Sequence, residues 1–94
     1  MTPPSTERGF RLGGRVQGVG FRWWTREVAE GLGITGTVRN CTDGTVEIQA
    51  RGEAETLETF SAKLREGPAH ARVEEVRSTE ADLPPGMDGF RIIR

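Results

Sequence analysis

The chain contains the segment Gly14-Arg15-Val16-Gln17-Gly18-Val19-Gly20-Phe21-Arg22, in which a strand pattern ends, glycines follow and a helix pattern begins. A turn of this kind directs successive backbone N–H groups inward, and a helix N-terminus adds about half a positive charge. An anion of phosphate size is therefore favoured at its mouth, where Arg22 can add a fork of donors. Because many strand-to-helix turns use glycine only for backbone geometry, the segment alone leaves a structural role open.

Two better-known phosphate motifs do not fit this segment. A Walker loop would continue with Gly-Lys-Ser/Thr, which does not follow here. The spacing of Gly18 and Gly20 begins a dinucleotide-binding fingerprint, but Trp23 stands where its third glycine is required.

Apolar periodicity predicts a strand before this segment and a helix after it. Over residues 10–16 the even positions are apolar or glycine and the odd positions include arginine, which is typical of a half-buried strand. From Phe21 onward apolar residues recur at helical spacing, and Gly31 and Gly33 lie where a C-cap belongs. Trp23 falls on the opposite side of this helix, so it either packs outside the main core or lies exposed. The predicted buried positions of the helix are Phe21, Trp24, Val28 and Leu32.

The middle of the chain predicts a hairpin followed by a second helix. Residues 35–41 and 45–51 are β-prone runs on either side of Asp43-Gly44, which is a strong hairpin signal. Apolar residues then trace an amphipathic helix over 54–64, which Gly67-Pro68 ends because proline cannot continue it.

Two strands complete the pattern and indicate the fold. Residues 71–78 form a strand whose alternation slips at Glu74-Glu75, which predicts a β-bulge. After a loop over 81–89, Phe90 and Ile92 indicate a short last strand. The order β-α-β-β-α-β plus this strand predicts an α+β, ferredoxin-like split-βαβ fold, with both helices on one face of an antiparallel sheet.

Length and hydropathy limit the classes of protein. From its 94 residues we expect one domain and not a multidomain enzyme. We expect a disordered tail over residues 1–7 and one folded domain over residues 8–94. No apolar run approaches the roughly 20 residues that span a bilayer, and the start lacks the regions of a signal peptide, so we expect a cytoplasmic protein without a membrane partner.

Charge is segregated along the chain. The formal net charge is −1, yet residues 8–26 carry five arginines and no acid, whereas residues 27–94 hold eight basic and 13 acidic residues. The basic segment suits a small anion, although solvated arginines on a strand and a helix are the ordinary alternative. One cysteine and one histidine exclude a disulfide framework and a Cys/His metal cluster, so no cofactor is expected.

Two motifs in the same order resemble the acylphosphatase family. The first is Val16–Arg22, preceded by Gly14, and the second is Gly36–Asn40, followed by Gly44–Val46. The similarity runs over residues 8–94. It implies an acylphosphatase-like domain, and a hydrolase that cleaves the carboxyl–phosphate bond of acyl phosphates to carboxylate and inorganic phosphate without a metal.

The resemblance also implies roles for individual residues. In that family the loop matching Arg15–Phe21 cradles the phosphoryl group, the arginine matching Arg22 binds its oxygens, and the asparagine matching Asn40 orients the attacking water. Members commonly carry an aromatic residue at the position of Thr37, a difference that concerns packing beside the second strand. The expected substrate-binding residues are Arg15, Val16, Gln17, Gly18, Val19, Gly20 and Phe21, and the expected catalytic residues are Arg22 and Asn40.

The residue types of the two motifs suit a substrate that is already reactive. They include no His, Asp, Glu or Lys that could serve as a general base. An acyl phosphate is a mixed anhydride whose carboxylate departs unprotonated, and phosphoryl transfer asks mainly for positioning and charge stabilisation. We expect Arg22 and backbone donors to supply the charge, and the side-chain carbonyl of Asn40 to accept a hydrogen bond from the water while a substrate oxygen takes its proton.

Several of these residues have structural alternatives. Asn40 and Asp43 are turn formers that could simply shape the hairpin. Cys41 lacks a nearby histidine or helix N-terminus and is expected to be an ordinary strand residue. His70 is expected in a loop without a catalytic role, and Trp23 could stack on an aromatic acyl group or cover a helix edge.

Two functional alternatives belong to other classes. A non-catalytic phosphate-binding or regulatory domain of the same fold would keep the loop and Arg22 but has no need of Asn40. An RNA-binding module would carry stacking aromatics on its third strand, where residues 46–50 have none. We therefore expect a small-molecule acyl phosphate as the partner, no nucleic acid, and a monomer.

Overall fold

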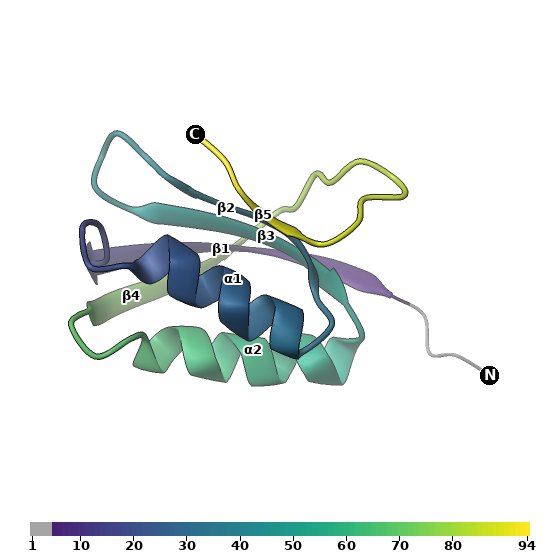
Figure 1. Cartoon of the computed structure of the whole chain (residues 1–94), viewed down its shortest axis with the longest axis horizontal. Helices are drawn as coiled ribbons and strands as arrows, with labels where there is room; N and C mark the ends of the chain where they lie inside the picture. The colour runs from purple at the N-terminus through teal and green to yellow at the C-terminus, as the bar shows by residue number, and fades with distance from the viewer. Residues whose placement is uncertain (1–4) are drawn as a thin grey trace.

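Seven elements follow one another in the computed structural model, which describes residues 5–94. Both helices cover one face of a five-stranded sheet (Figure 1), so the predicted α+β split-βαβ arrangement is confirmed. The elements are β1 (Thr6–Arg15), α1 (Phe21–Gly31), β2 (Thr35–Asn40), β3 (Val46–Gly52), α2 (Ala54–Glu66), β4 (Arg72–Thr79) and β5 (Phe90–Ile92).

The sheet has the strand order β4-β1-β3-β2-β5. β1 pairs antiparallel with β3 and β4, and β2 pairs antiparallel with β3, as predicted. β5 differs, because it lies parallel to β2. Its register is held at both ends, where the Gly36 N–H donates to the Gly89 carbonyl at 3.0 Å and the Ile93 N–H donates to the Val38 carbonyl at 2.9 Å.

The predicted β-bulge in the fourth strand is confirmed. Gly13 of β1 lies opposite Glu75 and Gly14 lies opposite Val73, so Glu74 is the extra residue. Gly14 has φ 117°, and a Cβ there would meet the Arg72 carbonyl oxygen at 2.3 Å, so only glycine fits. A bulge bends and twists its strand, and this one lies just before β1 enters the glycine-rich loop.

The core lies between the sheet and the two helices. In α1 the fully buried residues are Phe21, Thr25 and Ala29, whereas the predicted core positions after Phe21 are only partly buried at its margin. Small side chains at the centre of this face let the helix approach the sheet closely. The partly buried positions are Trp24, Val28 and Leu32. The side chains that fill the sheet side of the core include Phe10, Leu12, Val16, Val38, Val46, Ile48, Ala50 and Phe90.

The first strand begins earlier than the predicted domain boundary at Arg8. Thr6 lies opposite Gly52 in the ladder between β1 and β3, and Glu7 follows it in the same strand. The remainder of the predicted tail, residues 1–4, lies outside the described residues. Within residues 5–94, neither helix is long and apolar enough to cross a membrane.

Candidate active site

The loop from β1 to α1 and the hairpin from β2 to β3 lie at the same end of the sheet (Figure 1). A cavity of about 210 Å³ opens between this loop, the start of α1 and the edge formed by β2 and β5. Both sequence motifs therefore contribute to one site. The cavity is lined by Val16, Gly18, Gly20, Phe21, Arg22, Trp23, Asn40 and Ile92.

The glycine-rich loop presents backbone donors to this cavity. Gly18 has φ 75° and Gly20 has φ 76°, the left-handed conformation that side chains disfavour. A Cβ at either position would meet nothing within 4 Å, so the requirement for glycine is conformational rather than steric. None of the backbone N–H groups of residues 17–23 donates a hydrogen bond to a residue in the described range 5–94. The loop and the first turn of α1 thus carry free backbone donors beside the cavity, which favour an anion there.

Arg22 adds a positive charge to these donors. It is half-buried in the first turn of α1, lines the cavity, and forms no ion pair or hydrogen bond with the side chains of residues 5–94. Arg26, one turn later, instead approaches Glu30 with its Nε at 3.9 Å from Oε1. The guanidinium of Arg22 is therefore available to a bound anion.

Asn40 ends β2 with its side chain at the cavity. Its Oδ1 atom is buried and has no hydrogen-bond partner in the described part of the chain. The hairpin turn is shaped by Asp43 instead, whose Oδ1 accepts from the Thr45 N–H at 3.1 Å and from the Thr45 hydroxyl at 2.6 Å. The hydrogen bond from that hydroxyl is the main reason that the pKa of Asp43 lies below its usual range. The turn-forming alternative thus describes Asp43 and not Asn40.

Gln17 connects the loop to the hairpin. Its Nε2 donates to the Cys41 carbonyl at 2.8 Å and to the Thr45 carbonyl at 2.9 Å. Both acceptors lie just beyond the β2 end that carries Asn40. The amide of Gln17 therefore fixes the distance between the donors of the loop and Asn40.

The family follows from comparison with known proteins, in which the acylphosphatase family model matches residues 9–92. The chain belongs to the acylphosphatase family. A relative named acylphosphatase from Salinibacter ruber is 46% identical over 84 residues, covering 89% of this chain and 88% of the relative. The crystal structure of acylphosphatase from Bacillus subtilis has a TM-score of 0.87 at 33% identity, covering 94% of this chain and 98% of that one. An acylphosphatase from Coxiella burnetii has a TM-score of 0.86 at 36% identity, covering 95% and 93%.

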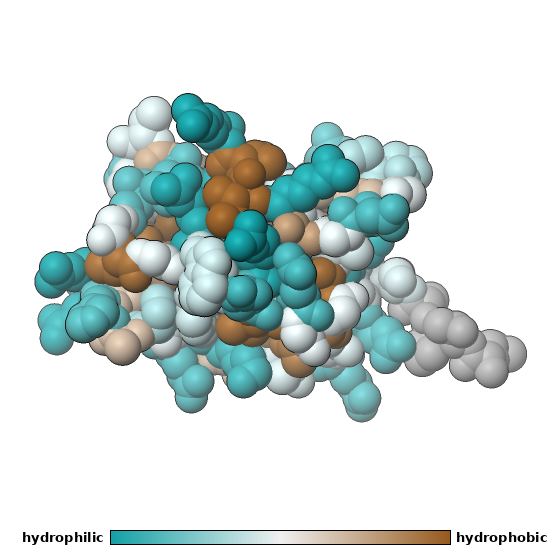
Figure 2. All heavy atoms as spheres, viewed as in Figure 1, coloured by the Kyte–Doolittle hydropathy of each residue, from teal (hydrophilic) through white to brown (hydrophobic). Residues whose placement is uncertain are grey.

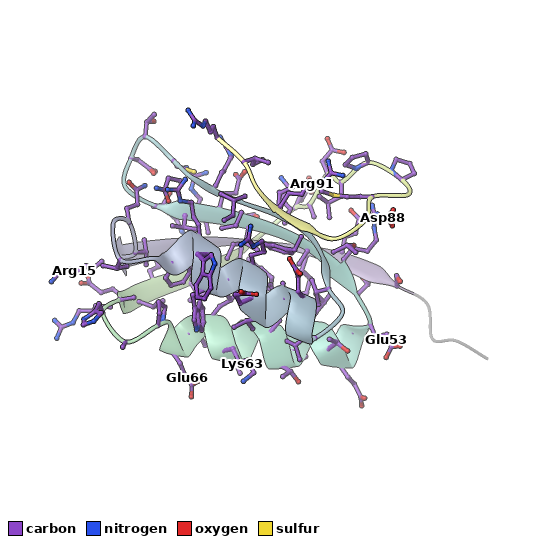
Figure 3. All side chains as sticks on the ribbon, in the orientation of Figure 1. Arg15, Glu53, Lys63, Glu66, Asp88 and Arg91 are labelled. Atoms are coloured by element: carbon purple, nitrogen blue, oxygen red, sulfur yellow. The ribbon has the colours of Figure 1, made fainter. Side chains whose placement is uncertain are left out.

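Three of the site residues expected from sequence lie outside the cavity lining of this acylphosphatase-family chain. Arg15 is exposed, and Figure 3 shows its side chain projecting away from the molecule beyond the end of the sheet. Gln17 binds the hairpin, and Val19 packs partly against the core. The expected residues that do line the cavity are Val16, Gly18, Gly20, Phe21, Arg22 and Asn40.

Two lining residues are not among the expected site residues. The sequence leaves Trp23 open between stacking on an aromatic acyl group and covering a helix edge, and it predicts Ile92 only as part of the short last strand. The parallel pairing of β5 with β2 brings Ile92 to the cavity, and no local pattern in the sequence indicates that neighbour. Cys41 lies buried directly after β2, and His70 lies in the exposed loop before β4.

Proposed function

We propose that this cavity hydrolyses the carboxyl–phosphate bond of acyl phosphates, giving a carboxylate and inorganic phosphate. The chain is an enzyme of the acylphosphatase family, and its function as an acyl phosphate hydrolase follows from that membership. One observation supports the mechanism. Free backbone N–H groups, the guanidinium of Arg22 and the Oδ1 atom of Asn40 all lie at one cavity, and none of them has a partner within residues 5–94.

The phosphoryl group binds at the loop and at Arg22. The free N–H groups of residues 17–23 and the positive end of α1 favour its oxygens, and the planar guanidinium can contact two of them at once. Because the charge on these oxygens persists through a loose transition state, the same donors stabilise both substrate and transition state.

Asn40 positions the water that attacks phosphorus. A buried carbonyl without a partner costs free energy, so a ligand or water that donates to Oδ1 is favoured there. The water donates one hydrogen bond to this atom and passes its other proton to a phosphate oxygen as the P–O bond to the new oxygen forms. The carboxylate departs with the electrons of the broken bond and needs no acid, because it is a stable anion.

A non-catalytic phosphate-binding or regulatory domain is the weaker candidate. Such a domain would use the loop and Arg22 but would have no use for an unsatisfied amide oxygen in the cavity wall. Asn40 therefore favours catalysis.

The proposal also includes the location, the oligomeric state and the ligands of the enzyme. We expect a cytoplasmic monomer that acts on small molecules and binds no nucleic acid. Analytical ultracentrifugation at enzyme concentrations used in assays measures the oligomeric state directly.

The decisive experiment measures phosphate release from acetyl phosphate by the purified protein in excess chelator. We expect full activity, because no group of three or more His, Cys, Asp or Glu side chains in residues 5–94 could hold a metal ion. An alkyl phosphate monoester is the matched control substrate, and it should be hydrolysed poorly since no acid protonates its alkoxide. Activity that requires a divalent metal, or similar rates on both substrates, would contradict the mechanism.

A further inference from the structure

The described residues expose three large apolar side chains, and two of them line the cavity. Trp23 is 57% exposed, Ile92 is 37% exposed and Ile93 is 38% exposed. Trp23 and Ile92 belong to the cavity lining and Ile93 does not. Figure 2 shows apolar atoms at the surface in the region where the chain continues from β5 toward the C-terminus.

Local geometry explains why Trp23 and Ile92 meet there. Phe90 is buried against the helices, and Ile92 lies two residues later on the same face of β5. α1 packs against β5, and Trp23 follows Arg22 in its first turn. An indole and an isoleucine side chain therefore stand beside the proposed phosphate donors.

The cavity is larger than a phosphoryl group needs. Its volume is about 210 Å³, on a measure by which one water needs roughly 10–15 Å³, so it exceeds what the four heavy atoms of a phosphoryl group occupy. The other apolar lining residues, Val16 and Phe21, are buried and face the core. Within residues 5–94, Trp23 and Ile92 are the exposed large apolar side chains of the cavity lining, so the uncharged end of a substrate held at the loop can contact them.

We propose that Trp23 and Ile92 form an acyl-binding rim, and that the enzyme prefers acyl phosphates whose acyl group is apolar and aromatic. This inference rests on the proposed function, since it assigns the part of the same substrate that the loop does not hold. An aromatic acyl group can stack on the indole of Trp23 and contact the side chain of Ile92, contacts that an acetyl group is too small to make.

The test compares kcat/KM for benzoyl phosphate and acetyl phosphate, two substrates with the same reacting bond. We expect the unaltered protein to favour benzoyl phosphate. In Trp23→Ala the ratio of the two values should fall by about fivefold, whereas Trp23→Phe should retain most of the preference because it keeps a ring. Alanine is a good helix former, so the substitution on the exposed face of α1 leaves the helix intact.

Ile92 and Ile93 provide a matched pair of variants. Their exposures are nearly equal and they are adjacent in sequence, but only Ile92 lines the cavity. Ile92→Ala should lower the ratio by about twofold to threefold, whereas Ile93→Ala should leave both kcat/KM values unchanged. Circular dichroism of each variant checks that the fold is retained.

Different failures of this experiment have different meanings. An equal fall on both substrates in Trp23→Ala would show that the indole supports the loop instead of the acyl group, and an unchanged ratio would show that it contacts neither. Either result overturns the acyl-binding rim and leaves the proposed hydrolysis standing. Inactivity of the unaltered protein on both substrates would overturn the proposed function, and the rim with it.

Discussion

Arg22 and Asn40 reach the cavity from different elements, the first turn of α1 and the end of β2. The guanidinium of Arg22 contacts phosphate in our proposal whether or not a reaction occurs. In the same proposal the amide of Asn40 contacts only the water. Substituting Arg22 should therefore affect both phosphate binding and turnover, whereas substituting Asn40 should affect turnover alone. The comparison separates stabilisation of the phosphoryl charge from positioning of the water.

Arg22→Ala should weaken binding of inorganic phosphate and lower kcat/KM by about 100-fold, the scale of losing a donor to a developing oxyanion. Arg22→Lys should also be poor, because an ammonium is a point charge without the planar fork. Isothermal titration with phosphate and steady-state kinetics measure both effects. Arg26→Ala is the matched control one turn later and should retain both properties, so equal losses at Arg22 and Arg26 would argue for a general field effect.

Asn40→Ala should keep the affinity for inorganic phosphate within a few-fold while kcat falls by about 100-fold, equivalent to about 3 kcal/mol of transition-state stabilisation. The same titration and kinetic measurements apply. Asp43→Ala is the comparison, since Asp43 shapes the turn and should affect stability more than kcat. If Asn40→Ala abolished phosphate binding, or behaved like Asp43→Ala, the water-positioning role would be wrong.

Cys41→Ser should leave kcat nearly unchanged, because no step of the mechanism uses the thiol. Cys41 is buried and follows Asn40 in sequence, so a role of its thiol as a nucleophile should be tested. A fall in kcat of more than about 100-fold, with circular dichroism unchanged, would restore a covalent mechanism to consideration.

At the scale of elements, the site depends on how the loop and the hairpin are joined. The two hydrogen bonds from Gln17 cross from the loop to the carbonyls of Cys41 and Thr45. These carbonyls also accept from backbone N–H groups within the turn, so they stay satisfied without Gln17. The side chain thus contributes more to the placement of the loop than to the stability of the hairpin.

Gln17→Leu should raise KM by about tenfold and cost about 1 kcal/mol of stability, the net worth of ordinary hydrogen bonds. Kinetics on acetyl phosphate and thermal unfolding give the two numbers. Gln49→Leu is the matched control, because Gln49 accepts from the Asp82 N–H at 3.0 Å and does not line the cavity. A loss of stability with KM unchanged would show that Gln17 does not position the loop.

At the scale of the whole molecule, local patterns predicted most of the fold. The hairpin, the helix ends and the β-bulge at Glu74 depend on residues close in sequence, and the structure contains them. The predicted apolar residues of α1 do pack against the core, but Thr25 and Ala29 are more deeply buried than Trp24, Val28 and Leu32. Periodicity did not indicate Thr25 and Ala29 because they are small and weakly apolar. Small residues are buried where the helix packs on the sheet. The sequence of the helix alone does not indicate which of its residues face the sheet.

Features of the site that depend on residues far apart in the sequence were predicted less well. The two motifs predicted that Arg22 and Asn40 belong to one site, and both residues line the same cavity, whereas their roles there remain a prediction. Arg15 ends β1 with an exposed side chain outside the cavity lining, and the sequence of the three-residue β5 does not indicate which strand it pairs with. Thr37, where the family commonly has an aromatic residue, lies on β2 between Gln49 and Arg91, so the core does not depend on it.

The strand order also has a consequence for how quickly the enzyme becomes active after synthesis. In the sheet, Gly9 lies opposite Thr79 and Gly36 lies opposite Phe90, so residues far apart along the chain must meet before the ladders form. Closing such long loops loses chain entropy before any contact compensates for it, so we expect this fold to form more slowly than a helical bundle of the same length. The cavity lining comes from the β1–α1 loop, the first turn of α1, Asn40 and Ile92, so a partly folded chain in which these segments have not yet met has an incomplete site even when its helices have formed.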